Sequence, residues 1–198
     1  MKFLSNSLSA AKSLAGIILL FALSAQLHAA AMLSLSGSAM DVKYENDTEV
    51  RLSLIDWSSV EERAEVEKAY REYQKNNDLE GFLAKVEQQE TRGYLFSAAA
   101  TGYRIKYAWK KDMEGGQEMY FLVTPGLKTR NPYLWNTPNN YSPEFTLVQV
   151  QMNEDSGIAK TSLDGEIVFG EQSNLQLKAF NDLPQFASLK DSTPYYLK

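Results

Sequence analysis

The chain of 198 residues contains no cysteine and one histidine, His28. Without cysteine the fold has no disulfide bond, no thiol nucleophile and no cysteine-based zinc site. His28 lies in an N-terminal segment that we expect to be cleaved off, and cleavage after it excludes a Ser-His-Asp triad, a histidine general base and a histidine metal ligand. Glycine-rich phosphate loops and nucleophile-elbow motifs are also missing, so we predict neither a metal nor a cofactor.

Long apolar runs are scarce as well. The longest, residues 14–25, is shorter than the roughly 20 residues that cross a bilayer. It follows two lysines and leads into three alanines, which is the pattern of a signal peptide. We therefore expect residues 1–31 to be removed, so that the mature chain starts between Ala30 and Met32, in the periplasm or outside the cell. The alternative is an uncleaved N-terminal anchor, whereas cleavage leaves no stable transmembrane segment.

Basic residues are fewer than acidic residues in this chain. Lysine and arginine number 20 against 25 aspartates and glutamates, for a net charge of −5, and removal of residues 1–31 takes away two lysines and leaves −7. Nucleic-acid binding depends on neutralising phosphates with Lys and Arg, so we expect no nucleic-acid partner. Residues 32–198 are long enough for a single domain with one hydrophobic core.

The clearest secondary-structure pattern lies between Arg92 and Pro125. Alternation over residues 103–110 predicts a strand with two different faces. The apolar face has Tyr103, Ile105, Tyr107 and Trp109, and the basic face has Arg104, Lys106 and Lys110. After Gly115-Gly116, whose paired glycines can supply positive φ, residues 119–124 return as the second strand of a hairpin.

A helical hairpin is expected over residues 58–89. Ser58 and Ser59 each stand three residues before a glutamate, which is the spacing of a capping box. Asn76–Asp78 ends the first helix and caps the second. The expected apolar stripes are Val60, Ala64, Val66, Ala69, Tyr70 and Tyr73 in the first helix, and Leu79, Phe82, Leu83 and Val86 in the second. These stripes must cover one face of the sheet.

The remaining strands are shorter. Residues 33–44 change phase at Gly37-Ser38, which suggests a bulge or a break, and they pair with residues 50–54. Further strands are expected at residues 94–98, 146–152, 158–163, 167–170, 175–179 and 186–189, with Asp164-Gly165 as a hairpin turn. No single helix joins consecutive strands, so this order predicts an α+β fold with a mainly antiparallel sheet, either a sandwich or a partly open barrel.

Several short pieces resemble a family of uncharacterised exported bacterial proteins. They are Ile55-Asp56-Trp57-Ser58-Ser59 followed by Glu62-Arg63, Arg92-Gly93-Tyr94, Gly102-Tyr103-Arg104-Ile105-Lys106-Tyr107-Ala108 and Ser142-Pro143-Glu144-Phe145-Thr146-Leu147. Together they extend over nearly all of the mature chain. The resemblance implies export and a shared fold, and it implies no particular activity, cofactor or catalytic residue.

Residues 125–143 form the longest stretch without periodicity and hold four of the 6 prolines. Long loops in compact domains are often functional, and aromatic rings beside amides and arginine suit a ligand or a protein surface. The expected binding residues are Arg130, Tyr133, Trp135, Asn136, Asn139, Asn140 and Tyr141 of the loop, with Arg104 and Lys106 of the hairpin. The alternatives are that the rings fold back to plug the sheet and that the basic residues pair with nearby carboxylates.

These observations favour a non-catalytic, exported cell-envelope protein that binds an unknown ligand or envelope protein. One alternative is a carboxylate-dependent hydrolase acting on an envelope polymer, which needs two carboxylates about 5 to 9 Å apart. The acidic residues nearest to aromatic residues are Asp56, Glu118 and Glu144, but their spacing selects no pair. The other alternative is a purely structural component of the envelope.

Overall fold

The computed structural model describes residues 32–41, 46–97, 100–127, 144–154, 157–162, 165–183, 185 and 187–192, all within the unit Ala31–Lys198. Its strands are β1 (Leu33–Asp41), β2 (Asn46–Leu54), β3 (Gly93–Ser97), β4 (Ala100–Met113), β5 (Gly116–Thr124), β6 (Thr146–Asn153), β7 (Ile158–Ser162), β8 (Ile167–Phe169), β9 (Leu175–Leu177) and β10 (Ala187–Asp191). Its helices are α2 (Val60–Asn76), α3 (Leu79–Gln88) and the short 3-10 helix η1 (Phe180–Asp182). The expected signal peptide lies outside the described residues.

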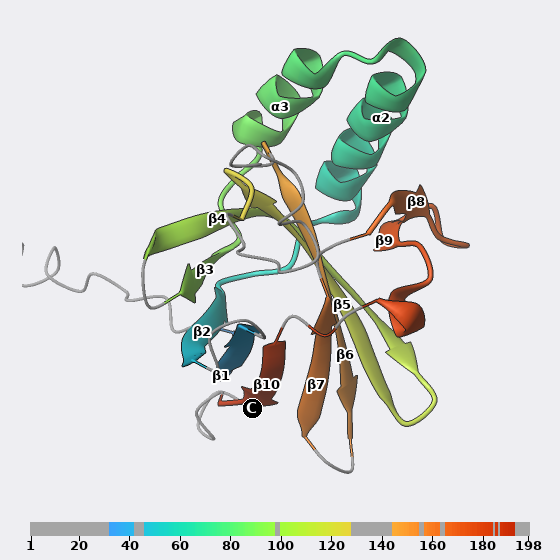
Figure 1. Ribbon diagram of the computed structural model, residues 1–198. Coiled ribbons are helices and arrows are strands. Elements are labelled where there is room, and N and C mark those ends of the chain that lie inside the picture. Colours follow the sequence, from blue (N-terminus) through green and yellow to red (C-terminus); the bar gives the residue numbers. More distant parts are fainter. Residues whose placement is uncertain are drawn as a thin grey trace, which may run out of the picture. The chain divides into compact units, whose positions relative to one another are not determined.

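The main sheet is a closed antiparallel barrel with the strand order β1-β10-β7-β6-β5-β4-β3-β2 (Figure 1). The closing pair is β1 with β10, which runs from Leu35 opposite Asp191 to Ala39 opposite Ala187. The prediction of a mainly antiparallel α+β fold is confirmed. The expected sandwich or open barrel is wrong, because the last strand returns to pair with the first.

Apolar side chains fill the inside of the barrel. Alternate residues of its strands point inward, as the two-residue period of a strand requires. The buried cluster consists of Leu35, Val50, Leu52, Leu54, Leu95, Ile105, Ala108, Met119, Phe121, Val123, Leu127, Val148, Val150, Ala187 and Leu189. The described interior is therefore a packed core, as in other small barrels whose width just accommodates side chains.

Residues just beyond two strands complete this interior. Trp57 follows β2 and packs against the interior cluster, with its ring centroid 6.1 Å from that of Phe121. Leu127 follows β5 and is also part of the cluster, and its N–H donates to Thr146 Oγ1 at 2.9 Å. Because β2 and β5 run in opposite directions, Trp57 and Leu127 pack at opposite ends of the barrel.

A bulge in β4 changes which residues face inward. The register with β5 shifts between Ile105 and Tyr107, which leaves Lys106 as the extra residue. A one-residue slip moves every following side chain to the other face. Ile105 therefore points into the barrel, whereas Tyr107 and Trp109 belong to a second cluster outside it. The prediction that these three residues share one face is wrong.

Glycines of the strands have two different roles. The expected bulge or break at Gly37-Ser38 is wrong, because the pairing of β1 with β2 continues without a shift from Leu33 to Asp41. A Cβ at Gly37 would overlap the carbonyl oxygen of Ser188 in β10, so glycine permits the close approach of the strands that close the barrel. In the β4–β5 turn, Gly115 alone supplies the positive φ, which is 77°.

The predicted helical hairpin is confirmed. Ser59 caps α2 with a complete capping box, in which Glu62 N–H donates to Ser59 Oγ and Ser59 N–H donates to Glu62 Oε2. Asp78 caps α3 by accepting from Gly81 N–H at 2.9 Å. The apolar stripe of α2 is shorter than expected, because Val60 is 66% exposed.

The helices and the β8–β9 pair cover the outside of β4, β5 and β6 (Figure 1). This outer cluster contains Val66, Ala69, Tyr70, Phe82, Val86, Tyr107, Trp109, Tyr120, Leu122, Leu147, Leu175, Leu177 and Phe180. The expected hairpin between residues 158–163 and 167–170 is wrong, because β7 pairs with β6 and β10 whereas β8 pairs with β9. Gln149 of β6 holds the small sheet in place by accepting from Leu177 N–H at 2.8 Å.

Candidate binding face on the outside of the barrel

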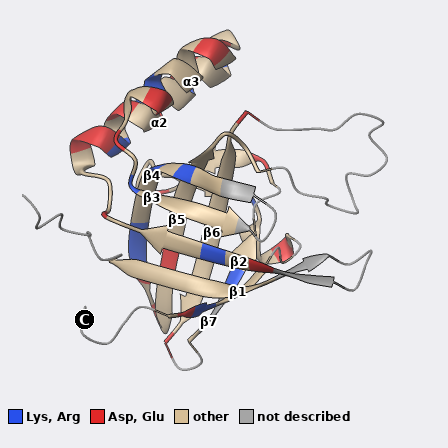
Figure 2. Ribbon diagram, turned by 90° about the vertical axis from the view of Figure 1, so that its left-hand side faces the viewer, with Lys and Arg blue, Asp and Glu red and all other residues tan. Residues whose placement is uncertain are grey.

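The outside of β2, β3 and the first half of β4 presents aromatic and basic side chains. Because Leu52 and Leu95 point inward, the residues on either side of them in β2 and β3 point outward. The outward set is Arg51 and Ser53 of β2, Tyr94 and Phe96 of β3, and Arg104 of β4. We call Arg51, Tyr94, Phe96 and Arg104 the aromatic-basic face. Figure 2 shows these strands from outside.

The pairing of strands determines how this face is arranged. Arg51 lies opposite Phe96, and Tyr94 lies between Ser53 and Arg104. The Tyr94 and Phe96 ring centroids are 6.0 Å apart, and the two ring planes differ by 33°. Tyr94 is 37% exposed, which is high for a large aromatic residue on a rigid strand. The face is thus a small platform of neighbouring rings.

Arg51 stacks on this platform. Its guanidinium carbon is 4.9 Å from the centroid of the Phe96 ring, within the range of a cation–π interaction. Phe96 has room because Gly102 lies beside it, where an added Cβ would come within 2.6 Å of the ring. Stacking restrains the plane of the guanidinium and leaves its edge, which carries the N–H donors, for hydrogen bonding.

Arg104, one of the predicted binding residues, lies at the border between this face and α3. Its Nη2 is 3.2 Å from Glu87 Oε1 and 3.1 Å from Glu87 Oε2. The Arg104 side chain is still 45% exposed. It can therefore contact a partner while paired with Glu87.

Lys106, the second predicted binding residue of the hairpin, lies beneath the end of α3. Its Nζ donates to the carbonyl oxygens of Gln89 at 2.8 Å and Glu87 at 3.2 Å, and the residue is 6% exposed. Burial lowers the pKa of Lys106, partly offset by the Glu87 carboxylate. This lysine satisfies the carbonyls at the end of a helix, a common role for a cation there. Its Nζ also lies 3.9 Å from Glu87 Oε2, so Lys106 and Arg104 pair with the same carboxylate. The binding role of Lys106 stays a prediction.

The seven predicted binding residues of the loop lie outside the described residues. They are Arg130, Tyr133, Trp135, Asn136, Asn139, Asn140 and Tyr141. The base of the loop is described: Thr124 pairs with Arg104, and Gly126 N–H donates to the carbonyl oxygen of Glu144 at 3.1 Å. The last residue of β5, Thr124, is therefore the cross-strand neighbour of Arg104 in the aromatic-basic face.

The carboxylates considered for hydrolysis are held by different partners on different elements. Asp56 Oδ1 accepts from Trp57 N–H at 2.8 Å, and its Oδ2 is 3.6 Å from Arg92 Nη1. Glu118 on β5 accepts from the hydroxyl of Tyr120 and pairs with Lys111 at 2.8 Å. Glu144 is exposed at the base of the loop. Asp56, Glu118 and Glu144 therefore share no side-chain partner in the contacts described, and the hydrolase alternative stays a prediction.

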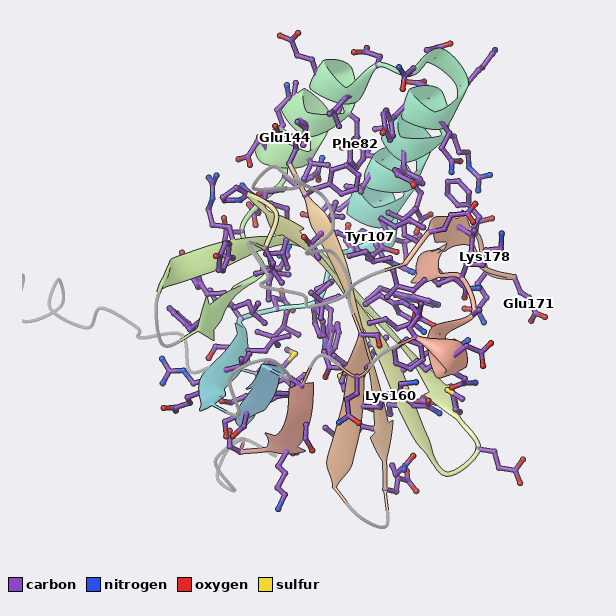
Figure 3. All side chains as sticks on the ribbon, in the orientation of Figure 1. Phe82, Tyr107, Glu144, Lys160, Glu171 and Lys178 are labelled. Atoms are coloured by element: carbon purple, nitrogen blue, oxygen red, sulfur yellow. The ribbon has the colours of Figure 1, made fainter. Side chains whose placement is uncertain are left out.

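A buried contact that sequence reasoning missed joins α2 to the barrel. Tyr107, labelled in Figure 3, is a residue with 0% exposure. Its hydroxyl donates to Glu67 Oε1 at 3.0 Å. Burial raises the pKa of Glu67 above its ordinary value, although Tyr107, Arg63 and Arg71 oppose the rise. Burial also raises the pKa of Tyr107, which keeps the phenol protonated. The contact therefore acts as a polar anchor for the helical hairpin.

From the raised pKa of Glu67 we predict how the stability of a Glu67→Gln variant changes with pH. A carboxyl whose pKa is higher in the folded chain favours folding below its unfolded value, and this advantage is lost as pH rises through the folded pKa. Glu67→Gln stays neutral and can still accept from Tyr107. Relative to the parent, its free energy of unfolding should therefore increase from pH 4 to pH 7, as measured by urea melts across this range.

Glu62→Gln is the matched control, with the opposite sign. Burial alone raises the pKa of Glu62, but the Ser59 N–H and the Arg92 guanidinium lower it below its ordinary value. Its stabilising effect is thus present above the unfolded pKa and disappears as pH falls through the folded one. Glu62→Gln should cost stability at pH 7 and little at low pH. Equal pH dependence of the two variants would contradict both assignments.

The described part of the chain has no cluster of metal ligands and no membrane-spanning helix. No three side chains of the His, Cys, Asp or Glu type come together there in a way that could hold a metal ion. None of the helices in these ranges is long and apolar enough to cross a membrane. Comparison of the chain with family models, curated proteins and solved structures finds no match. The resemblance to exported bacterial proteins therefore stays a prediction.

Proposed function

We propose that this chain is a non-catalytic, exported cell-envelope protein that binds a protein partner through the aromatic-basic face. The observation that supports this most directly is the exposed stack of Arg51, Phe96 and Tyr94 on the wall of the barrel that the helices leave uncovered. Thr124, which precedes the segment 125–143, pairs with Arg104 of this face, and we propose that the rings of the segment extend the same surface.

The residue types and their rigidity support a binding role. Tyr and Arg are enriched among the residues that dominate protein interfaces. Tyr94 and Phe96 lie on a strand that is paired on both sides, with β2 and β4. Side chains on a rigid scaffold lose less conformational entropy on association than those on a flexible one. The side chains of this surface are therefore preorganised for binding.

The curvature of the barrel favours a protein over a narrow polymer. Side chains on the outside of a closed barrel diverge, so a thin chain contacts few of them, whereas a broad or concave surface contacts all. A partner cannot extend the barrel by adding a strand, because every strand of the closed sheet is already paired on both sides. Recognition must therefore use side chains of the aromatic-basic face.

Export is a separate part of the proposal and rests on the pattern of residues 1–31. We predict that the mature chain starts between Ala30 and Met32 and fractionates outside the cytoplasm. N-terminal peptide mass spectrometry on fractionated cells measures this directly. An intact N-terminus on exported, membrane-embedded protein would show that the segment is an anchor instead.

The binding role can be tested by placing a photo-activated cross-linking amino acid at Tyr94 in cells that make the full chain. We expect a discrete cross-linked band at this position, because the proposed partner covers it. The control places the same amino acid at Val60, which is 66% exposed on α2, away from the aromatic-basic face. A band of equal strength at both positions, or none at Tyr94, would refute the proposed surface.

A further inference from the structure

We infer that the partner presents an acidic segment to this wall and that Arg51 binds one of its carboxylates. This inference rests on the proposed function and specifies the partner's chemistry. It starts from the hydrogen-bonding state of Arg51. The ion pairs among the described residues do not include Arg51, although its side chain is exposed.

Among the described arginines, Arg92 and Arg104 form ion pairs with glutamates. Arg63 and Arg71 form none there, but the Glu67 carboxylate lies near enough to interact with both electrostatically. Arg51 lies over the Phe96 ring, which covers one side of its guanidinium. A planar guanidinium presents parallel N–H donors that match the two oxygens of a carboxylate.

The surroundings of Arg51 leave space for such a group. Its neighbours on the same outer surface include Ser36, opposite it on β1, and Ser53, two residues further along β2. Serine side chains are short, and Arg51 itself is exposed. Glu49, the exposed residue on the other side of Arg51 in β2, would repel a carboxylate. The carboxylate therefore approaches from the side of Ser53 and Tyr94.

Two more cations extend the site across the wall. Lys190 of β10 is exposed and lies opposite Ser36, which in turn lies opposite Arg51. These two cations are thus separated by two strand spacings, about 10 Å in a sheet. Arg104 lies across β3 on the other side, next to Tyr94. Lys190 and Arg51 share one cross-strand row, and Arg104 lies in the row of Ser53 and Tyr94. These three cations complement several carboxylates on one segment, with apolar neighbours packed on Tyr94.

The experiment titrates the full mature chain, labelled with nitrogen-15, with a ten-residue glutamate-rich peptide containing one leucine. It is done at about 0.15 M salt, where the Debye length is about 8 Å and distant charges are screened. We expect the backbone signals of β2 and β3 around Arg51 and Phe96 to shift. Arg51→Gln should weaken binding about tenfold or more, the loss expected when a charged hydrogen-bonding partner is removed.

Three controls make the outcome decisive. Lys68→Gln, at an exposed position of α2, should change affinity less than about twofold. Arg51→Lys keeps the charge and loses the planar donors, so undiminished affinity in this variant would overturn the assigned carboxylate geometry. Oligogalacturonate carries carboxylates on a sugar chain, and binding as tight as that of the peptide would overturn the choice of a protein segment.

Failure of this inference can be told apart from failure of the proposed function. If the peptide does not bind while cross-linking at Tyr94 persists, the wall still binds a partner but not through acidic groups. If the peptide does not bind and Tyr94 gives no cross-link, both the inference and the proposed function are overturned. Retention of peptide binding in Arg51→Gln, with shifts elsewhere on the protein, would likewise exclude Arg51 as the carboxylate site.

Discussion

Phe82→Ala should lower the free energy of unfolding by about 3 to 5 kcal/mol, the range for removing a large aromatic residue from a packed core. Phe82 is 2% exposed. Its ring centroid lies 5.5 Å from that of Tyr70, 5.8 Å from that of Tyr73 and 4.9 Å from that of Phe145 (Figure 3). These rings come from α2 and from the residue just before β6, so the cavity cannot close without moving the hairpin on the barrel.

Phe96→Ala is the matched comparison, because it deletes the same atoms on the uncovered wall. Phe96 is half-buried, whereas Phe82 is fully buried, so removal of the Phe96 ring should cost clearly less than removal of the Phe82 ring. Both free energies come from denaturant melts of the full chain. A loss below about 0.5 kcal/mol for Phe82→Ala, the size of a surface substitution, would mean that the helical hairpin is itself an interaction surface.

The elements that could be predicted from the sequence are those determined by neighbours in the chain. Ser59 with Glu62 and Asp78 with Gly81 make capping contacts three residues apart, so the helix boundaries follow from local spacing. The hairpin of β4 and β5 is similarly local, because one glycine turn joins two alternating runs. In these segments local propensity and tertiary structure agree.

What could not be predicted depends on contacts between distant residues. Alternation alone places Tyr107 on the same face as Ile105, and only the bulge at Lys106 moves it outside the barrel. At that bulge, Lys106 Nζ is buried against the carbonyl oxygens of Glu87 and Gln89 at the end of α3. These residues are too far from Lys106 in the sequence for a local pattern to predict the contact. Closure of the barrel by β10 likewise depends on pairing with the first strand.

Of the four residues of the aromatic-basic face, only Arg104 was predicted from the sequence as a binding residue. Arg104 was identified because it lies in the strongest alternating run of the sequence. Tyr94 and Phe96 were missed, although they alternate with Leu95 and so must face away from the core once β3 is recognised as a barrel strand. An aromatic pair at outward positions is the signal that could have revealed the face. The stacking of Arg51 on Phe96 depends on cross-strand register, which the sequence does not specify by itself.

The second large effect is expected at Tyr107. Its ring is fully buried between α2 and the barrel, so Tyr107→Ala should cost about 3 to 5 kcal/mol. Part of this loss comes from the cavity and part from the anchor to Glu67. Tyr107→Phe separates the two, because it keeps the ring and removes only the hydroxyl that donates to the carboxylate.

Tyr107→Phe leaves the partly buried Glu67 carboxylate without this donor, which typically costs about 1 to 3 kcal/mol. The cost should be larger at pH 7 than near pH 4, because the ionised fraction of Glu67 increases with pH and only the carboxylate needs the donor. The double variant with Glu67→Gln should recover part of the loss, since an amide oxygen tolerates a missing donor better than a carboxylate does. If Tyr107→Phe costs the same at both pH values and Glu67→Gln restores nothing, the Tyr107 hydroxyl does not anchor α2 through Glu67.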